Sequence, residues 1–315
     1  MTWLLENGMN EKNINLSIDI QGLKLKNPVI AASGTYGFGR EYAEYVDLND
    51  WGGISVKGLT LEERIGNPPP RTVETPSGML NAIGLQNPGV HAFIQNELPF
   101  LRRFDTAVIA NVAGNTAEEY ATMARILDKA DIDAIELNLS CPNVKKGCMA
   151  FGSTPEGIFQ VVKDVRRETR KPLIVKLTPN VTDITEPAIA AQEAGADILS
   201  LINTLLGMVI DIHTRKPVLA NNTGGLSGPA VRPVAVRMVY QVAQAVSIPV
   251  IGMGGITSGK DAIEFILAGA SAVMVGTWNF ADPACVKKIT EEIKAYMIRY
   301  DISDLKELVG KVEIY

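Results

Sequence analysis

A run of apolar residues gives way to reactive and polar ones in the segment ELNLSCPNV at residues 136–144. A strand that continued into a protein core would have no reason to carry this ending, which consists of Asn138, Ser140, Cys141, Pro142 and Asn143. The thiol of Cys141 is open to three interpretations, namely a small core residue, a metal ligand, or a group that acts on a substrate.

A zinc site at Cys141 would need further ligands at metal-binding spacing. Cys148 lies in the same segment without a histidine nearby, and His91 and His213 belong to other parts of the chain, so we expect no metal. A core residue would lie within the apolar run instead of beyond it, at a turn marked by proline. The remaining interpretation is a reactive thiol, and because no His or Asp stands beside Cys141 to form a nucleophilic dyad, a general base is favoured.

Eight apolar runs alternate with helical segments along the chain, and continuous runs are typical of parallel strands covered on both faces. They occupy residues 28–34, 52–58, 106–114, 134–141, 172–179, 196–204, 248–255 and 271–277. Helix starts are marked by Thr116 with Glu119, which predicts a capping box, by Thr154 with Pro155, and by Ser258 with Asp261. Eight such units in about 250 residues predict a closed (β/α)8 barrel.

We expect one domain over residues 1–315, because no linker or low-complexity segment divides the chain. Residues 14–27 alternate around Gln21 and Gly22, which predicts a β-hairpin at the barrel floor. Long loops are expected after the second strand (about residues 59–104), the fourth (141–153) and the sixth (204–230).

Active sites of such barrels lie at the C-terminal ends of the strands. Here these ends are polar, and Lys57 and Lys176 each follow apolar residues, so each ammonium would need an anion. The last two strands end in GMGGIT and VGT, where glycines and helix N-termini favour a phosphate. Since no GxGxxG fingerprint is present, a mononucleotide fits better than a dinucleotide.

The composition suits a globular protein of the cytoplasm, with 46% hydrophobic and 21% charged residues. A net charge of -5 without a basic run makes nucleic acid an improbable partner. Three cysteines in a long chain indicate free thiols in a reducing compartment. We also expect neither secretion nor a membrane span, because no apolar run is long enough and the N-terminus lacks a basic flank.

Several motifs together resemble the class 1 dihydroorotate dehydrogenases, from about Leu16 to the C-terminus. They are ASGTYGFG at 32–39, NAIGLQNPG at 81–89, NLSCPN at 138–143, INT at 202–204, GGLSGPAVRPVA at 224–235 and GMGGI at 252–256. The resemblance implies an FMN-containing (β/α)8 barrel that oxidises dihydroorotate to orotate in pyrimidine synthesis, with Cys141 as the catalytic base.

The resemblance also implies two sets of binding residues. Dihydroorotate or orotate would contact Lys57, Asn81, Ala82, Ile83, Gly84, Leu85, Asn138, Asn203 and Thr204. FMN would contact Ser33, Lys57, Gly58, Asn111, Asn138, Lys176, Ile202, Gly228, Gly254, Gly255, Gly276 and Thr277.

Within class 1, the segments GFGREY at 37–42 and VKKGCMAFG at 144–152 resemble class 1B, the NAD-linked type. This implies a homodimer of this chain joined to electron-transfer subunits, which carry FAD and a [2Fe-2S] cluster, in a heterotetramer. Class 1A, which uses fumarate and needs no such partner, is the nearest alternative. A non-redox phosphate-binding isomerase or lyase and a non-catalytic FMN scaffold are the others.

Two positions depart from the family pattern. Cys148 stands where we expect glycine, and we interpret it as a spectator instead of a second base. Gly58 stands where relatives often have a hydroxyl residue, so only a backbone contact to FMN would remain there.

Overall fold

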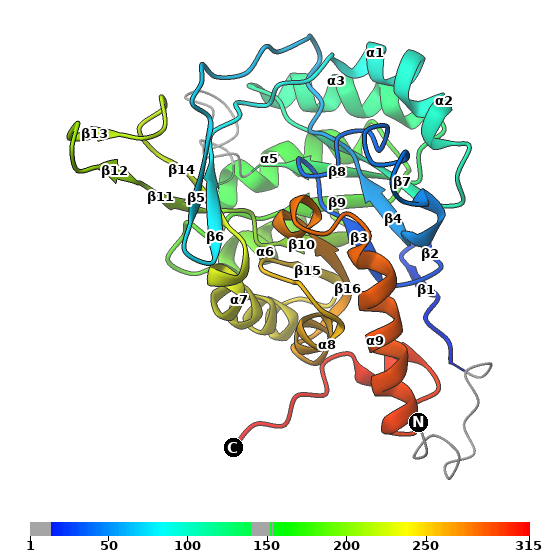
Figure 1. The fold of residues 1–315 in the computed structure, drawn as a ribbon. Helices are drawn as coiled ribbons and strands as arrows, with labels where there is room; N and C mark the ends of the chain where they lie inside the picture. The colour runs from blue at the N-terminus through cyan, green and yellow to red at the C-terminus, as the bar shows by residue number, and fades with distance from the viewer. Residues whose placement is uncertain (1–13, 140–151, 153) are drawn as a thin grey trace.

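The computed structural model describes residues 14–139, 152 and 154–315. Eight parallel strands close into a barrel, each paired with the next and the last with the first (Figure 1). In barrel order they are β3 (Val29–Ala31), β4 (Gly53–Ser55), β7 (Ala107–Val112), β8 (Ala134–Asn138), β9 (Leu173–Lys176), β10 (Ile198–Leu201), β15 (Val250–Met253) and β16 (Ala270–Val275). Seven of them lie within the predicted apolar runs and β16 begins one residue before its run, so the predicted (β/α)8 barrel is confirmed.

Helices separate most of the strands and cover the outside of the barrel. They are α3 (Ala117–Asp128), α5 (Pro155–Arg166), α6 (Thr185–Glu193), α7 (Arg232–Ala245), α8 (Gly259–Leu267) and α9 (Cys285–Arg299). After β4, the helical segment is built from α1 (Val90–Ala92), the π-helical turn η3 (Phe93–Glu97) and α2 (Leu98–Leu101). Among the described residues, no helix is both long and apolar enough to cross a membrane.

The first unit departs from the simple alternation, because only the 3-10 turn η2 (Leu48–Asp50) lies between β3 and β4. Similar short turns are η4 (Pro229–Val231), η5 (Thr277–Phe280) and η6 (Leu305–Leu308). All six residues of β7 are buried, which explains why the strand sequences are continuously apolar and do not alternate.

The predicted N-terminal hairpin is formed by β1 (Ile18–Ile20) and β2 (Leu23–Leu25), which pair in antiparallel register. It lies at the N-terminal end of the barrel, where a Cβ added at Gly53, the first residue of β4, would lie 3.3 Å from Cδ2 of Leu25. The hairpin therefore closes the barrel floor, as expected.

The predicted helix starts are found, with one correction. Oγ1 of Thr116 accepts a hydrogen bond from the backbone N–H of Glu119, and Thr154 and Ser258 cap α5 and α8 in the same way. The reciprocal bond of a capping box is displaced by one residue, because Oε2 of Glu119 accepts from the backbone N–H of Asn115 at 2.6 Å instead of from Thr116. The Glu119 side chain thus holds the chain just before the N-cap.

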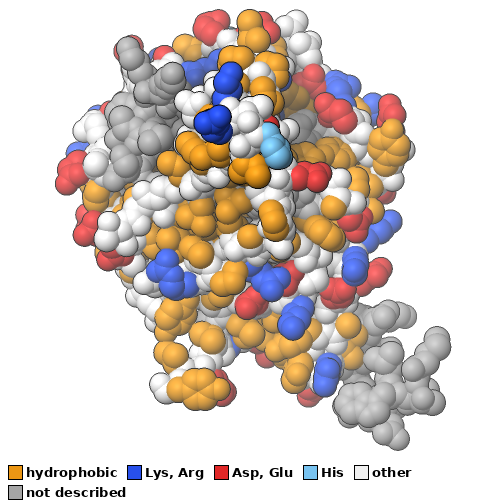
Figure 2. Space-filling view, turned by 60° about the vertical axis from the view of Figure 1, so that its left-hand side comes forward, with side chains coloured by type: hydrophobic (Ala, Val, Ile, Leu, Met, Phe, Trp, Pro, Cys, Tyr) orange, Lys and Arg blue, Asp and Glu red, His pale blue; other side chains and the backbone are white. Residues whose placement is uncertain are grey.

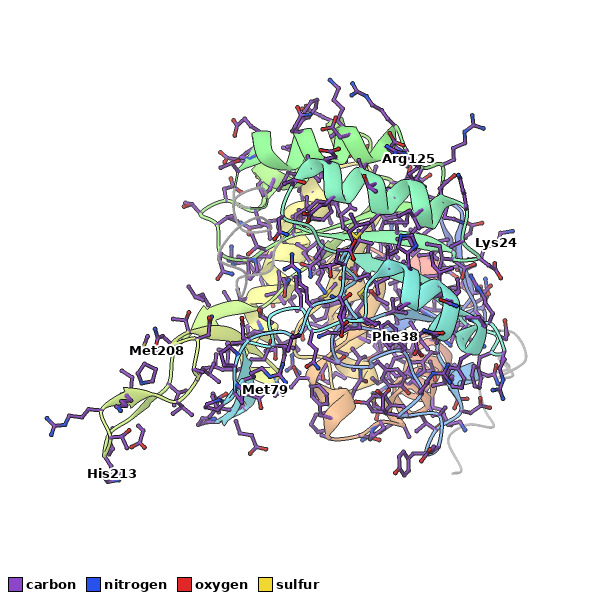
Figure 3. All side chains as sticks on the ribbon, turned by 90° about the horizontal axis from the view of Figure 1, so that it is seen from above. Lys24, Phe38, Met79, Arg125, Met208 and His213 are labelled. Carbon is purple, nitrogen blue, oxygen red and sulfur yellow. The ribbon has the colours of Figure 1, made fainter. Side chains whose placement is uncertain are left out.

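The long segments after β4 and β10 are not simple loops. They contribute β5 (Thr72–Thr75), β6 (Gly78–Asn81), β11 (Leu205–Gly207) and β14 (Gly224–Ser227), which pair in the order β11, β14, β6, β5. From this outer sheet an arm made of β12 (Ile210–Asp211) and β13 (Lys216–Pro217) extends away from the barrel, with Met208 and His213 along it (Figures 1 and 3). Figure 2 turns this side forward and shows hydrophobic side chains gathered over the middle of the face.

Candidate active site

A cavity of about 1300 Å³, its open mouth included, lies over the C-terminal ends of the barrel strands. Lys57 stands just after β4, Asn138 and Lys176 end β8 and β9, and Gly276 follows β16. The outer sheet supplies a further wall through residues such as Met79 of β6. Ligands of (β/α)8 enzymes bind at this end of the barrel.

The cavity brings together most of the residues that the sequence predicted for a site. These are Ser33, Lys57, Gly58, Asn81, Ile83, Gly84, Leu85, Asn138, Lys176, Ile202, Asn203, Thr204, Gly228, Gly254, Gly255, Gly276 and Thr277. They come from strands that lie far apart in the sequence, so their convergence is produced by the closed barrel.

Among the described residues, two that the sequence predicted do not line the cavity. Ala82 is buried beside Leu80 and Leu219, and its N–H and carbonyl bond to Arg71 and Asn67, so its side chain packs under the outer sheet. Asn111 is fully buried behind the cavity wall. Cys141, like Cys148, lies outside the described residues.

Lys176 is a buried cation in the wall of the cavity. Its side chain is buried, 5% of the residue remains exposed, and no described residue forms a hydrogen bond or an ion pair with it. Because an ammonium is costly to bury without a counterion, this position favours an anionic or electron-rich ligand. Lys57 is half-buried, and its backbone N–H donates to the carbonyl of Gly37 at 3.0 Å.

Another part of the cavity wall is built from glycines after β14, β15 and β16. Gly228, Gly254 and Gly255 have φ values of 102°, 128° and 79°, a region that other residues rarely adopt. A Cβ on Gly255 would lie 2.8 Å from the carbonyl oxygen of Gly228, so a side chain there would clash with the neighbouring loop. These loops lead into η4 and α8, where backbone N–H groups favour a phosphate.

The pair Asp261 and Arg232 supports these glycine loops from behind. Asp261 accepts from the backbone N–H and hydroxyl of Thr257 at 2.9 and 2.8 Å, and Arg232 donates to its other oxygen. Burial alone would raise the pKa of Asp261, but hydrogen bonds from Thr257 and Ser258 and the Arg232 charge outweigh burial and lower this pKa. The carboxylate therefore stays ionised and holds the loop after β15 in place.

The segment NAIGL is braced by Asn67, a residue that the sequence reasoning missed. The backbone N–H of Asn67 donates to the carbonyl of Ile83 at 2.9 Å, and its Nδ2 donates to the carbonyl of Ala82 at 3.0 Å. A Cβ at Gly84, whose φ is 77°, would lie 2.6 Å from the Asn67 backbone nitrogen. Only glycine fits this contact, and no sequence signal beyond the polar GNPPP segment pointed to Asn67.

Asn180 is a second asparagine that the sequence did not point to, and it supports the other amides of the cavity. Asn203 Nδ2 lies 3.4 Å from Oδ1 of Asn138, and its own Oδ1 accepts from the N–H of Thr204 at 2.8 Å. Asn180 then bridges this corner to the outer sheet, donating to the carbonyl of Thr204 at 3.0 Å and accepting from the N–H of Leu206 at 2.9 Å. The asparagines at the ends of β8 and β10 are thus held side by side.

The thiol of Cys285 is not a candidate for chemistry. It begins α9, is 1% exposed and points to Oδ1 of Asn279. Burial raises its pKa to about 12, so the thiolate is scarcely populated near neutral pH. No group of three or more His, Cys, Asp or Glu residues in the described chain is placed to hold a metal ion.

The residues of the cavity fit a flavin nucleotide. The glycine loops suit a phosphate, and the buried Lys176 ammonium suits an electron-rich ring. Beside Gly58, Oδ1 of Asn111 is a buried acceptor that no described residue satisfies, and a ring N–H would suit it. The fold and the cavity together define a (β/α)8 barrel whose ligand cavity lies at the C-terminal ends of the strands.

Comparison with known proteins identifies the family. The model of the dihydroorotate dehydrogenase family matches residues 15–297, and the chain belongs to this family, which implies a flavin cofactor. The chain is 60% identical over 301 residues to the protein named dihydroorotate dehydrogenase B (NAD(+)), catalytic subunit, of Thermoanaerobacter pseudethanolicus, covering 96% of this chain and 100% of that one. Proteins of the same name from Alkaliphilus oremlandii and Geobacter metallireducens are both 58% identical, over 95% and 96% of this chain and 99% and 100% of their own lengths.

Proposed function

We propose that this chain is the catalytic subunit of an NAD-linked dihydroorotate dehydrogenase, which oxidises dihydroorotate to orotate in pyrimidine synthesis. The observation that carries the proposal is the convergence of a buried cation, three amides and a glycine cradle in one cavity of a chain that belongs to this family. The relatives that share 56–60% of its residues bear that name.

The cofactor in this proposal is FMN. When bound, FMN accepts a hydride from the substrate. Gly228, Gly254, Gly255, Gly276 and Thr277 would hold its phosphate, while Lys176 would stabilise the negative charge of the reduced ring. Ser33, Gly58 and Ile202 would line the ring, and Lys57 would lie between cofactor and substrate.

The substrate would lie beside the ring under the outer sheet. Asn81, Asn138, Asn203 and Thr204 offer amide and hydroxyl groups to its carboxylate and ring amides, and the backbone of residues 83–85 completes the pocket. Cys141, three residues beyond Asn138, would remove a proton from the ring carbon next to the carbonyl.

The electrons would leave through a partner. The relatives are named catalytic subunits, which supports a second subunit, and we propose that it carries FAD and a [2Fe-2S] cluster and passes electrons to NAD. A homodimer of this chain flanked by two such subunits would form a heterotetramer of the cytoplasm.

Anaerobic addition of dihydroorotate to the purified yellow protein tests the proposal. We expect bleaching of the flavin absorption, recovery of the colour with NAD only when the partner chain co-purifies, and no recovery with fumarate. A protein that carries no flavin, or a flavin that dihydroorotate leaves oxidised, would refute the proposal. Recovery with fumarate alone would assign the chain to the fumarate-dependent type instead.

A further inference from the structure

A carboxylate is buried inside the barrel beneath the cavity. Glu136 of β8 has no exposed surface and accepts hydrogen bonds from three other strands. Ser55 Oγ and Asn111 Nδ2 donate to its Oε2 at 2.7 and 2.6 Å, and Ser200 Oγ donates to its Oε1 at 2.7 Å. Since β4 and β7 lie on one side of β8 and β10 lies beyond β9 on the other, these side chains can meet only in the barrel interior.

Packing alone does not explain a carboxylate at this position. The interior of a (β/α)8 barrel is usually filled by branched apolar side chains, which need no hydrogen-bond partners. A carboxylate is costly to bury, and here three further polar side chains, Ser55, Asn111 and Ser200, are buried with it as donors. Glu136 therefore gives its neighbours a property that packing does not require.

The property is the orientation of the Asn111 amide. A carboxamide has a donor side and an acceptor side of nearly the same shape, whereas a carboxylate can only accept. Glu136 therefore requires Nδ2 of Asn111 to face it, and Oδ1 must face away. Oδ1 is buried and accepts no hydrogen bond from the described residues, and a Cβ built on the cavity-lining Gly58 would lie 3.0 Å from it.

We propose that Glu136 is a positioning residue that fixes the Asn111 amide with its acceptor toward the flavin. The inference rests on the proposed function, because it requires a flavin in the cavity. The oxidised isoalloxazine ring has one N–H group, the imide, and the fixed Oδ1 accepts from it. If the amide turned over, its N–H₂ group would oppose that imide N–H, and two donors would face each other.

A double-mutant cycle tests whether Glu136 acts through Asn111. Glu136→Gln keeps the size of the side chain, but a glutamine can face either side of the Asn111 amide and no longer fixes its orientation. In the wild-type background we expect roughly tenfold weaker binding of FMN to the apoprotein and a shifted absorption spectrum of the bound flavin. In an Asn111→Ala background the same substitution is expected to change FMN affinity by less than about twofold.

The matched control is Ser200→Ala, which removes the donor to Oε1 and leaves the Oε2 contact to Asn111 in place. It is expected to lower the unfolding temperature of the apoprotein while FMN affinity and spectrum stay unchanged. Equal losses of affinity from Glu136→Gln in both backgrounds would mean a structural role only and would overturn the proposal. So would an FMN affinity and spectrum that Glu136→Gln leaves at wild-type values.

A second arm covers the case in which Glu136→Gln fails to fold. Asn111→Leu fills the same space without an acceptor, and we expect it to bind FMN roughly tenfold more weakly than Ser200→Ala does. Equal affinities of these two variants would overturn the proposal. Failure of the wild-type apoprotein to bind FMN would instead refute the proposed function, so the two failures are distinguishable.

Discussion

The two ends of the barrel are built from the same strands but have opposite chemistry. At the N-terminal end, Ile18, Ile20, Leu23 and Leu25 of the hairpin are at most 6% exposed and cover the barrel with apolar surface. At the C-terminal end, the strands finish in amides, glycines and the buried Lys176. The difference indicates that the floor supplies stability, whereas the mouth keeps polar groups at the end of the barrel where ligands bind.

The largest effect is expected from Cys141→Ser at the mouth. The thiol is the proposed base, and the substitution replaces it with a hydroxyl that ionises far less readily. Anaerobic reduction of the flavin by dihydroorotate near neutral pH should therefore slow by about 10²- to 10⁴-fold, while the flavin stays bound. Stopped-flow absorption measures this rate. Cys285→Ala, which alters the buried thiol of α9, serves as the control and should reduce at the wild-type rate. Unchanged reduction in Cys141→Ser would contradict the assignment.

A floor substitution should have the opposite pattern. Leu23 is fully buried, and Leu23→Ala leaves a cavity under the barrel, so the free energy of unfolding should fall by about 2–5 kcal/mol. Denaturant unfolding measures the loss, and the flavin-reduction rate of the folded fraction should be unchanged. The exposed neighbour Lys24 provides the control, since Lys24→Ala should alter neither quantity appreciably. A slower rate in folded Leu23→Ala would show that the two ends are not independent.

A third substitution, Lys176→Met, should distinguish the role of the mouth in ligand binding from the role of the floor in stability. Lys176→Met keeps the length of a buried side chain but removes its charge, so the unfolding temperature of the apoprotein should stay the same or rise. Flavin binding should weaken by roughly tenfold and flavin reduction should slow, because the cation that meets the reduced ring is gone. Titration of apoprotein with FMN and thermal unfolding provide the two measurements.

The exposed Lys288 is the matched control for Lys176. Lys288→Met removes the same charge from the surface and should leave flavin affinity at the wild-type value. If both substitutions weakened flavin binding equally, the effect would come from net charge and not from the cavity.

The barrel could be predicted from the sequence because its physical requirement is local. A strand covered on both faces must be apolar throughout, and runs such as Ala107–Val112 satisfy this without reference to the rest of the chain. The outer sheet could not be predicted, because β11 and β14 are short and glycine-rich, and β14 pairs with β6 across more than a hundred residues. Such strands are stabilised by their partners more than by their own propensities.

The cavity was predictable in its lining but not in its supports. Strand-end residues such as Lys57 and Lys176 follow from the rule that barrel ligands bind at one end. Asn67, Asn180 and Glu136 act one layer behind the lining, where the deciding contacts join distant segments. Ala82 was assigned to the substrate because the motif NAIGL resembles the family pattern, yet its side chain packs into the outer-sheet core and its backbone groups bond to Arg71 and Asn67.

The smallest expected effect concerns Asp261, which supports the mouth from below. Its pKa is lowered in the folded chain, so its stabilising contribution is complete above the unfolded pKa of about 3.9 and is lost as the pH falls through the lower folded value. Asp261→Asn should therefore reduce the free energy of unfolding by about 1 kcal/mol at pH 7, where wild-type Asp261 is ionised beside Arg232. The difference between the two proteins should shrink below about pH 4. Urea unfolding at a series of pH values measures it, and a difference that stays constant down to pH 3 would show that the charge of Asp261 does not contribute. If flavin affinity falls together with stability, Asp261 contributes to the ligand site at the mouth. If flavin affinity is unchanged, Asp261 contributes only to the stability of the fold, as the floor does.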